Sequence, residues 1–163
     1  MNICGADGIT ATGAEAVSRA DLAKALTLGA RVPQYLPGQP NYRDVKDAVT
    51  MIFVESAQAS PNGSLFVDAT PGGNFRPNDP VSRLTAVVAL VRAAGFRAEA
   101  EAKAGSPLAF IDALSIPTEL RGYVAVAVVR GLIGSDSAFR PQVSMTRAEL
   151  AHAMVAIERL ATQ

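Results

Sequence analysis

The chain repeats one short motif at a fixed interval. The segment from Phe139 to Glu149 aligns without a gap on the segment from Phe75 to Thr85, and a second shift of the same length reaches Val17 to Asp21. The earliest copy keeps the hydroxyl and the Arg but has lost Phe-Arg-Pro. Self-similarity at a constant period indicates units that bury their apolar faces against their neighbours. The 163 residues therefore hold about two and a half units.

Apolar residues follow each copy of the motif at helical spacing. Leu26, Leu90 and Met154 occupy equivalent positions, and another equivalent apolar set lies one turn earlier. Spacings of three and four residues place such side chains on one face of a helix. The sequence thus predicts three helices, over residues 18–30, 82–95 and 146–161.

Two of the copies are preceded by a second shared feature. Tyr42-Arg43-Asp44 resembles Phe110-Ile111-Asp112 at a slightly longer shift, and each starts a segment with helical periodicity. These first helices are expected to end at Pro61-Asn62-Gly63 and at Gly131. Pro and Gly predict linkers over 33–40 and 99–107. The predicted fold class is all-α, with short extended pairs near 65–68.

Composition and residue counts exclude several functions. The 15 basic and 15 acidic residues give zero net charge, which argues against a nucleic-acid partner bound through its phosphates. One Cys and one His exclude a typical zinc site or a Cys/His catalytic pair. No apolar stretch is long enough to span a membrane. His152 has Lys24 and Val88 as its counterparts, so it is not a repeated feature. We therefore expect no metal, no cofactor and no enzymatic activity in this segment.

The repeated Arg is the strongest candidate for a functional side chain. Thr146-Arg-Ala-Glu149 fits a capping box, but capping gives no reason for Arg, because a cation there opposes the helix dipole. Arg19, Arg83 and Arg147 all stand at this position. An Arg beside helix-start N–H groups can bind a carboxylate or a phosphate. The alternative is an ion pair with an acid of a neighbouring unit, such as Asp44 or Asp112.

The ordered set of motifs resembles the S-layer homology domain. The third unit matches it best, at Phe110-Ile-Asp112, Tyr123-Val-Ala125, Gly131 to Gly134, Phe139-Arg-Pro141 and Thr146-Arg-Ala-Glu149. The resemblance implies tandem helix-loop-helix units in a pseudo-threefold, three-lobed bundle. The expected units are a partial first one over 1–36, with only its second helix, a second over 41–98 and a third over 109–163, which together form one module.

The resemblance also implies a function. Such modules hold exported proteins non-covalently on the bacterial surface by binding an acidic secondary cell-wall polysaccharide, often one with a pyruvyl ketal. By motif position, Arg19, Arg83 and Arg147 would contact the acidic sugar in grooves between units, with the groove at Arg147 favoured. The remaining members of the expected binding set are Asp44 and Asp112, which would accept sugar hydroxyls or orient the Arg groups, Glu149, and Tyr123 in place of the family's Trp.

The first unit lacks its aromatic-Asp start and its first helix, which leaves an apolar face to be covered. An upstream segment of a longer chain, or a second copy in a homo-oligomer, would complete it. We expect this chain to be the C-terminal anchoring part of a longer extracellular protein. The alternative function is a structural or oligomerisation module of an exported hydrolase, such as a subtilisin-like protease, without glycan binding.

Overall fold

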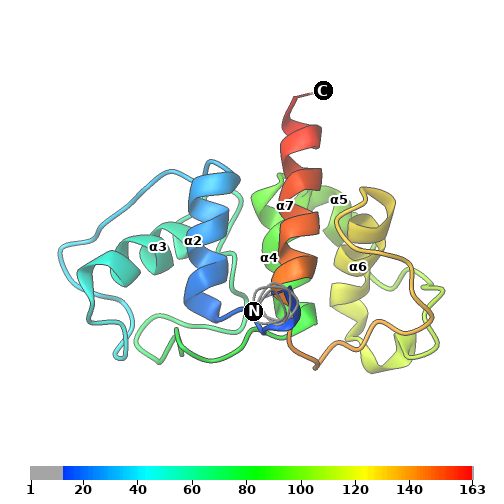
Figure 1. The fold of residues 1–163 in the computed structure, drawn as a ribbon, viewed down its shortest axis with the longest axis horizontal. Coiled ribbons are helices and arrows are strands. Elements are labelled where there is room, and N and C mark those ends of the chain that lie inside the picture. The colour runs from blue at the N-terminus through cyan, green and yellow to red at the C-terminus, as the bar shows by residue number, and fades with distance from the viewer. Residues whose placement is uncertain (1–12, 163) are drawn as a thin grey trace, which may run out of the picture.

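The computed structural model describes residues 13–162. Six α-helices and two short 3-10 helices make up its regular structure, and the described residues contain isolated β-bridges but no strand. The predicted all-α class is therefore confirmed (Figure 1). In chain order the elements are α2 (Arg19–Gly29), α3 (Ala48–Gln58), α4 (Arg83–Ala93), α5 (Arg97–Ala102), η1 (Ala113–Ser115), η2 (Thr118–Leu120), α6 (Arg121–Val129) and α7 (Arg147–Ala161).

The three helices predicted from the repeat are α2, α4 and α7, and each begins with its motif Arg. The residue before that Arg caps the helix: the side chains of Ser18, Ser82 and Thr146 each accept a hydrogen bond from the backbone N–H three residues later. A capping side chain satisfies one of the orphan N–H groups of the first turn. The hydroxyls of the motif thus start the helices, as the sequence predicts.

The starts of these helices are joined by a ring of three equivalent backbone contacts. Val17 N–H donates to the Met145 carbonyl, Met145 N–H to Val81 and Val81 N–H to Val17, each at 2.9 Å. The three isolated bridges follow the same order, because each joins a capping residue to the residue two positions before the next cap. The repeat in the sequence is therefore matched by a closed, cyclic set of contacts. The three-lobed arrangement of whole units stays a prediction.

The three helices differ in how deeply they are buried. Helix α3 packs against α2, and α6 packs against α4, and in Figure 1 α3 and α6 lie on opposite sides of α4. Nine of the eleven α4 residues are buried, whereas α7 buries only Ala153 and Ile157 of its fifteen. Helix α4 is therefore the central helix of the core, and α7 lies at its edge.

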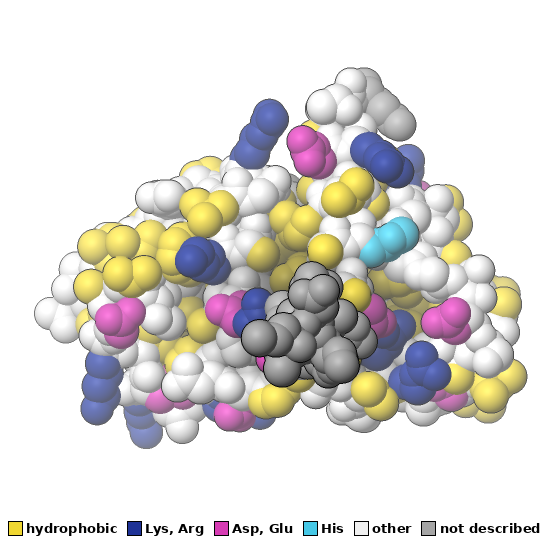
Figure 2. Space-filling model, in the orientation of Figure 1, with side chains coloured by type: hydrophobic (Ala, Val, Ile, Leu, Met, Phe, Trp, Pro, Cys, Tyr) yellow, Lys and Arg dark blue, Asp and Glu magenta, His cyan; other side chains and the backbone are white. Residues whose placement is uncertain are grey.

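The two connections between units are built differently. The predicted linker over 99–107 is wrong at its start, because α5 is helical through Ala102 and packs on α6. This close approach needs Gly122, where a Cβ would collide with the Ala100 carbonyl. The connection at 33–40 has three Pro residues and no helix. On the surface of this side of the molecule, apolar side chains gather over α3 (Figure 2). Proline stiffens the backbone and cannot donate the helical hydrogen bond.

The extended pairs predicted near 65–68 are absent: these described residues form a turn, in which Leu65 and Phe66 are buried. Their apolar side chains point into the core without any strand pairing. No helix among residues 13–162 has the length and apolar character needed to cross a membrane.

Candidate ligand-binding groove

Arg19 is buried and its guanidinium is held from three sides. Its Nε donates to the Phe75 carbonyl at 2.7 Å, and its two terminal nitrogens donate to the two carboxylate oxygens of Asp68, both at 2.9 Å. Its Cζ also lies 4.9 Å from the ring centroid of Phe75 and 5.2 Å from that of Phe66. A bidentate pair of this kind is strong and geometrically specific. Arg19 therefore ties the start of α2 to the loop before α4.

Arg83 repeats the same anchor one unit later. It is also buried, its Nε donates to the Phe139 carbonyl at 2.8 Å, and its Cζ lies 5.4 Å from the Phe139 ring centroid. Its acid partner is Glu149, at the start of α7. Burial lowers the pKa of the Arg83 guanidinium, and the positive charge of Arg140 acts in the same direction. Arginine still stays charged, because its guanidinium is not deprotonated in proteins.

Glu149 uses its two carboxylate oxygens for two different tasks. One accepts from the backbone N–H of Thr146 at 3.0 Å and completes the capping box of α7, while the other pairs with Arg83. In the middle unit Thr85 stands at this position and hydrogen-bonds Ser82. The acid that pairs with Arg19 therefore lies in a loop, whereas the acid that pairs with Arg83 lies at the start of a helix.

Among the described residues, neither of the two repeated aspartates hydrogen-bonds a motif arginine, so the predicted direct pairing is wrong, whereas their contact with sugar hydroxyls stays a prediction. Asp44 accepts from the backbone N–H groups of Phe75 and Arg76 at 2.8 and 2.7 Å. Asp112 accepts from the equivalent N–H groups, of Phe139 and Arg140, at 2.9 and 2.8 Å. Hydrogen bonds to the charged form favour it, and these two lower the pKa of Asp112. Both aspartates therefore shape the Phe-Arg-Pro loop.

Arg147 differs from the other two motif arginines. Its side chain is 47% exposed and pairs with Glu15 and Asp21 at 3.3 and 3.5 Å. The segment equivalent to Phe-Arg-Pro begins at Ala11, outside the described residues. The described partners of Arg147 are thus surface acids.

Tyr123 lies in the core rather than on a binding surface. It is 1% exposed, its hydroxyl accepts from Arg92 Nε at 3.0 Å, and the same hydroxyl donates to Glu101 at 3.2 Å. A ring this deeply buried has no face for stacking on a sugar, so the structure contradicts that expectation. Tyr123 instead links α6 to α4 and α5.

A groove of about 300 Å³ lies beside the Arg83–Glu149 pair. It is open to solvent and is bounded by the start of α4, the loop after α6 and the first turns of α7. Charged side chains and an apolar surface both line it, and the Nε2 of His152, one of the lining residues, lies 3.0 Å from the Gly131 carbonyl oxygen. Its lining residues are Arg83, Leu132, Ile133, Gly134, Asp136, Ala148, Glu149 and His152.

Two of the predicted site residues meet in this groove, Arg83 and Glu149, and they come from successive units. Sequence reasoning missed Asp136 and gave His152 no ligand-binding role. The signal for Asp136 was the shift that relates Asp112 to Asp44, because the same shift places Asp136 over Asp68. Nothing in the sequence marks His152, because its role follows from the packing of α7 beside Gly131. The described residues hold no cluster of three His, Cys, Asp or Glu side chains arranged for a metal.

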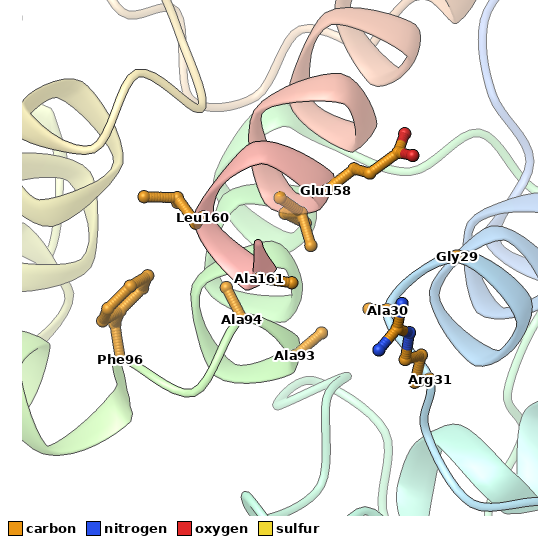
Figure 3. Close-up of a pocket in the computed structure, with 10 residues that line it drawn as sticks. Gly29, Ala30, Arg31, Ala93, Ala94, Phe96, Glu158, Leu160 and Ala161 are labelled. Atoms are coloured by element: carbon orange, nitrogen blue, oxygen red, sulfur yellow. The ribbon is translucent and has the colours of Figure 1, made fainter. Parts of the chain in front are cut away.

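A second hollow, of about 170 Å³, lies between the C-terminal ends of α2, α4 and α7 (Figure 3). Small residues such as Ala93 and Ala94 line it, and the Glu158 carboxylate points away from them. The charged groups at its rim are Arg31 and Glu158. This hollow has a smaller volume and fewer charged lining residues than the groove at Arg83. The groove at Arg83 is therefore the better candidate site.

Comparison with protein families matches the S-layer homology domain to residues 66–87. The matched segment includes Phe75-Arg-Pro77, Ser82 and Arg83, and it is consistent with the family that the repeat predicts. A search of curated proteins found no match. S-layer homology domains are non-catalytic modules that generally anchor proteins at the bacterial cell surface by binding cell-wall polysaccharide.

Proposed function

We propose that this S-layer homology chain anchors an exported protein non-covalently to the bacterial surface by binding an acidic, pyruvylated cell-wall polysaccharide. The observation that carries the proposal is the groove at Arg83, where a buried cation, two acids and an apolar wall come together between successive units. An anionic sugar presents the matching set of groups: a carboxylate, several hydroxyls and apolar ring faces.

The groove chemistry suits a ketal carboxylate in particular. A pyruvyl ketal carries one carboxylate and one methyl group on the same carbon, so that it needs a cation next to an apolar surface. Arg83 lines one part of the groove, and Leu132 and Ile133 line another. Arginine suits carboxylates because its planar fork of donors matches their oxygens. Asp136 and Glu149 can accept hydrogen bonds from sugar hydroxyls.

The three motif arginines take different roles in this proposal. Arg83 belongs to the binding groove, and the exposed Arg147 is open to an anion that displaces Glu15 or Asp21. Arg19 serves mainly as an anchor between units, because Asp68 already occupies both terminal nitrogens of its guanidinium. Asp44 and Asp112 contribute by fixing the loops that the arginines contact.

Sedimentation with purified cell-wall sacculi tests the proposal without any mutation. The chain should sediment with native sacculi, and chemical removal of the pyruvyl groups should lower the bound fraction at least tenfold. An Arg83→Ala/Arg147→Ala double variant, shown by circular dichroism to be folded, should lose binding to native sacculi. Equal sedimentation of the wild type with native and depyruvylated sacculi would contradict the proposal.

The edge helix α7 supports assembly as a second candidate function. Val91 of α4 is fully buried, but Val155, at the equivalent position of α7, is 47% exposed. Both α2 and α4 pack against a first helix, α3 and α6 respectively. We propose that a helix from a second copy covers this face of α7. Light scattering during size exclusion should then show a dimer that Val155→Asp dissociates, and a monomer at all concentrations would rule it out.

A further inference from the structure

The arginine of Phe-Arg-Pro has an unusual backbone in both described copies of the motif. Arg76 has a φ of 60° and Arg140 has a φ of 58°, in the left-handed region. A Cβ is sterically unfavourable there, and Gly occupies the region without that cost. The shape of the loop therefore favours Gly at this position, whereas the chain carries Arg twice. The backbone conformation therefore does not explain the Arg, and its side chain must have a separate role.

The neighbouring aspartate imposes this backbone. Asp112 accepts from the N–H groups of Phe139 and Arg140, and Asp44 does the same for Phe75 and Arg76. Two bonds from one carboxylate to successive N–H groups fix the direction in which the Arg side chain leaves the loop. The Cα–Cβ bond of Arg140 therefore has a fixed direction before any ligand arrives, which lowers the backbone part of the entropic cost of binding.

The Arg140 side chain is accessible, unlike that of Arg83. It is 53% exposed and pairs at 3.9 Å with Asp136, which lines the groove and is itself 71% exposed. At this distance and exposure, the ion pair is weak. The charge of Arg140 also reaches the groove, because it contributes to the lowered pKa of Arg83. Arg140 thus combines a position beside the groove with a guanidinium that is easily released.

Arg83, in contrast, is already occupied. Its Nε donates a hydrogen bond to the Phe139 carbonyl, and one of its terminal nitrogens forms an ion pair with Glu149. An anion that replaced Glu149 would separate an acid from a buried cation and disturb the capping box of α7. A ligand reaches Arg140 without that loss.

We propose that Arg140 makes the principal direct contact with the carboxylate of the anionic sugar, while Arg83 acts as a positioning residue that holds the groove in shape. This inference rests on the proposed function of the groove and assigns its specificity for acidic sugars to the loop arginine instead of the helix-start arginine. The chemical class of the ligand is a sugar that carries a carboxylate.

The matched variants Arg140→Gly and Arg76→Gly test this assignment. Both remove a guanidinium from a left-handed position, so both should keep or raise the thermal midpoint of unfolding. Binding is measured by calorimetry with methyl 4,6-O-pyruvyl-glucoside, and its methyl ester serves as the uncharged control. Arg140→Gly should weaken binding at least tenfold, Arg76→Gly should change it less than twofold, and the ester should bind the wild type as weakly as the acid binds Arg140→Gly.

Wild-type affinity for the pyruvylated glucoside in Arg140→Gly would overturn the inference, as would an equal loss in both variants. Arg140→Asn, which also tolerates a positive φ, repeats the test if the Gly variant unfolds. Sedimentation with sacculi distinguishes failure of the proposed function from failure of the Arg140 assignment. If the wild type binds neither sacculi nor the glucoside, the proposed function fails and this inference fails with it. If the wild type binds and Arg140→Gly binds equally, the inference alone fails.

Discussion

Arg19 and Arg83 are two versions of one anchor, and they differ in where the acid partner comes from. Both donate through Nε to a Phe carbonyl 56 residues later and lie over that Phe ring. Arg19 pairs with Asp68, in the loop after α3, whereas Arg83 pairs with Glu149, in the first turn of α7. The same cation is thus held by a loop at one interface and by a helix at the other.

The difference shows how two copies of a repeat can differ in one acid, so that the carboxylate beside Arg19 is occupied (the closed interface) while the equivalent carboxylate near Arg83 is accessible to a ligand (the open interface). With Thr85 at the helix position, Asp68 must turn inward to satisfy Arg19, and its side chain is 34% exposed. With Glu149 at the helix position, the equivalent Asp136 is released from that task and lines the groove. One acid at the start of a helix therefore frees another acid, and the loop that carries it, for a ligand.

The largest expected effect is on stability at the closed interface. Arg19→Ala should lower the free energy of unfolding by about 4 kcal/mol, because it leaves Asp68 with only its longer pair to Arg76 and removes the donor of the Phe75 carbonyl. Arg83→Ala should cost less, about 3 kcal/mol, because Glu149 keeps its capping-box bond. Urea denaturation measures both. A larger loss for Arg83→Ala would reverse the proposed order of the two anchors.

Moving the acid should convert the closed interface into the open type. Asp68→Ser alone is expected to cost about 3 kcal/mol, since it leaves the buried Arg19 without an acid partner. Thr85 Oγ1 lies 3.5 Å from an Asp68 oxygen, so a Glu at position 85 can reach the same guanidinium. The double variant Asp68→Ser/Thr85→Glu should recover at least half of the loss. Simple additivity in this double-mutant cycle would show that the two positions do not share Arg19.

The Phe-Arg-Pro loop that Asp112 holds should also respond to acid. The N–H bonds from Phe139 and Arg140 lower the pKa of Asp112 in the folded chain, so that its contribution to stability is present above the unfolded pKa, about 3.9. This contribution is lost as the pH falls through the lower, folded pKa. We expect the free energy of unfolding to decrease from pH 5 to pH 3, with a smaller slope in Asp112→Asn.

Asp136→Asn is the matched control for that titration, because Asp136 lines the open groove and its one described ion pair is long and exposed. Of the two Asn variants, Asp112→Asn should show the weaker dependence of the unfolding free energy on pH between pH 5 and pH 3. If the two Asn variants have the same slope, the loop bonds of Asp112 do not explain the acid response.

The smallest expected effect concerns the helix caps. Thr146→Ala removes the capping hydroxyl of α7 and should cost about 1 kcal/mol. Ser82→Ala should cost a similar amount at α4, although Ser82 has no acid to complete a capping box. Thermal unfolding of the two variants compares them. A loss below the error at both helices would mean that packing alone sets where they begin.

The repeated elements could be predicted from the sequence because each is specified locally. Hydroxyl, Arg and apolar spacing give α2, α4 and α7 within two residues at each end, and Asp44 and Asp112 are marked by their shared position. Partners across units could not be predicted, since nothing local says that Asp68 will turn toward Arg19 or that Asp112 will bind backbone N–H groups. Tyr123 illustrates the same limit: its place in the motif is visible in the sequence, whereas its burial depends on α4 and α5.

The most direct test of the central claim is a crystal structure of the chain with a pyruvylated disaccharide of the cell-wall polymer. We predict that the ketal carboxylate lies within hydrogen-bonding distance of the Arg140 guanidinium, with its methyl group against Leu132 or Ile133 and the Arg83–Glu149 pair intact. A saccharide bound away from this groove, or one that displaces Glu149 from Arg83, would contradict the account.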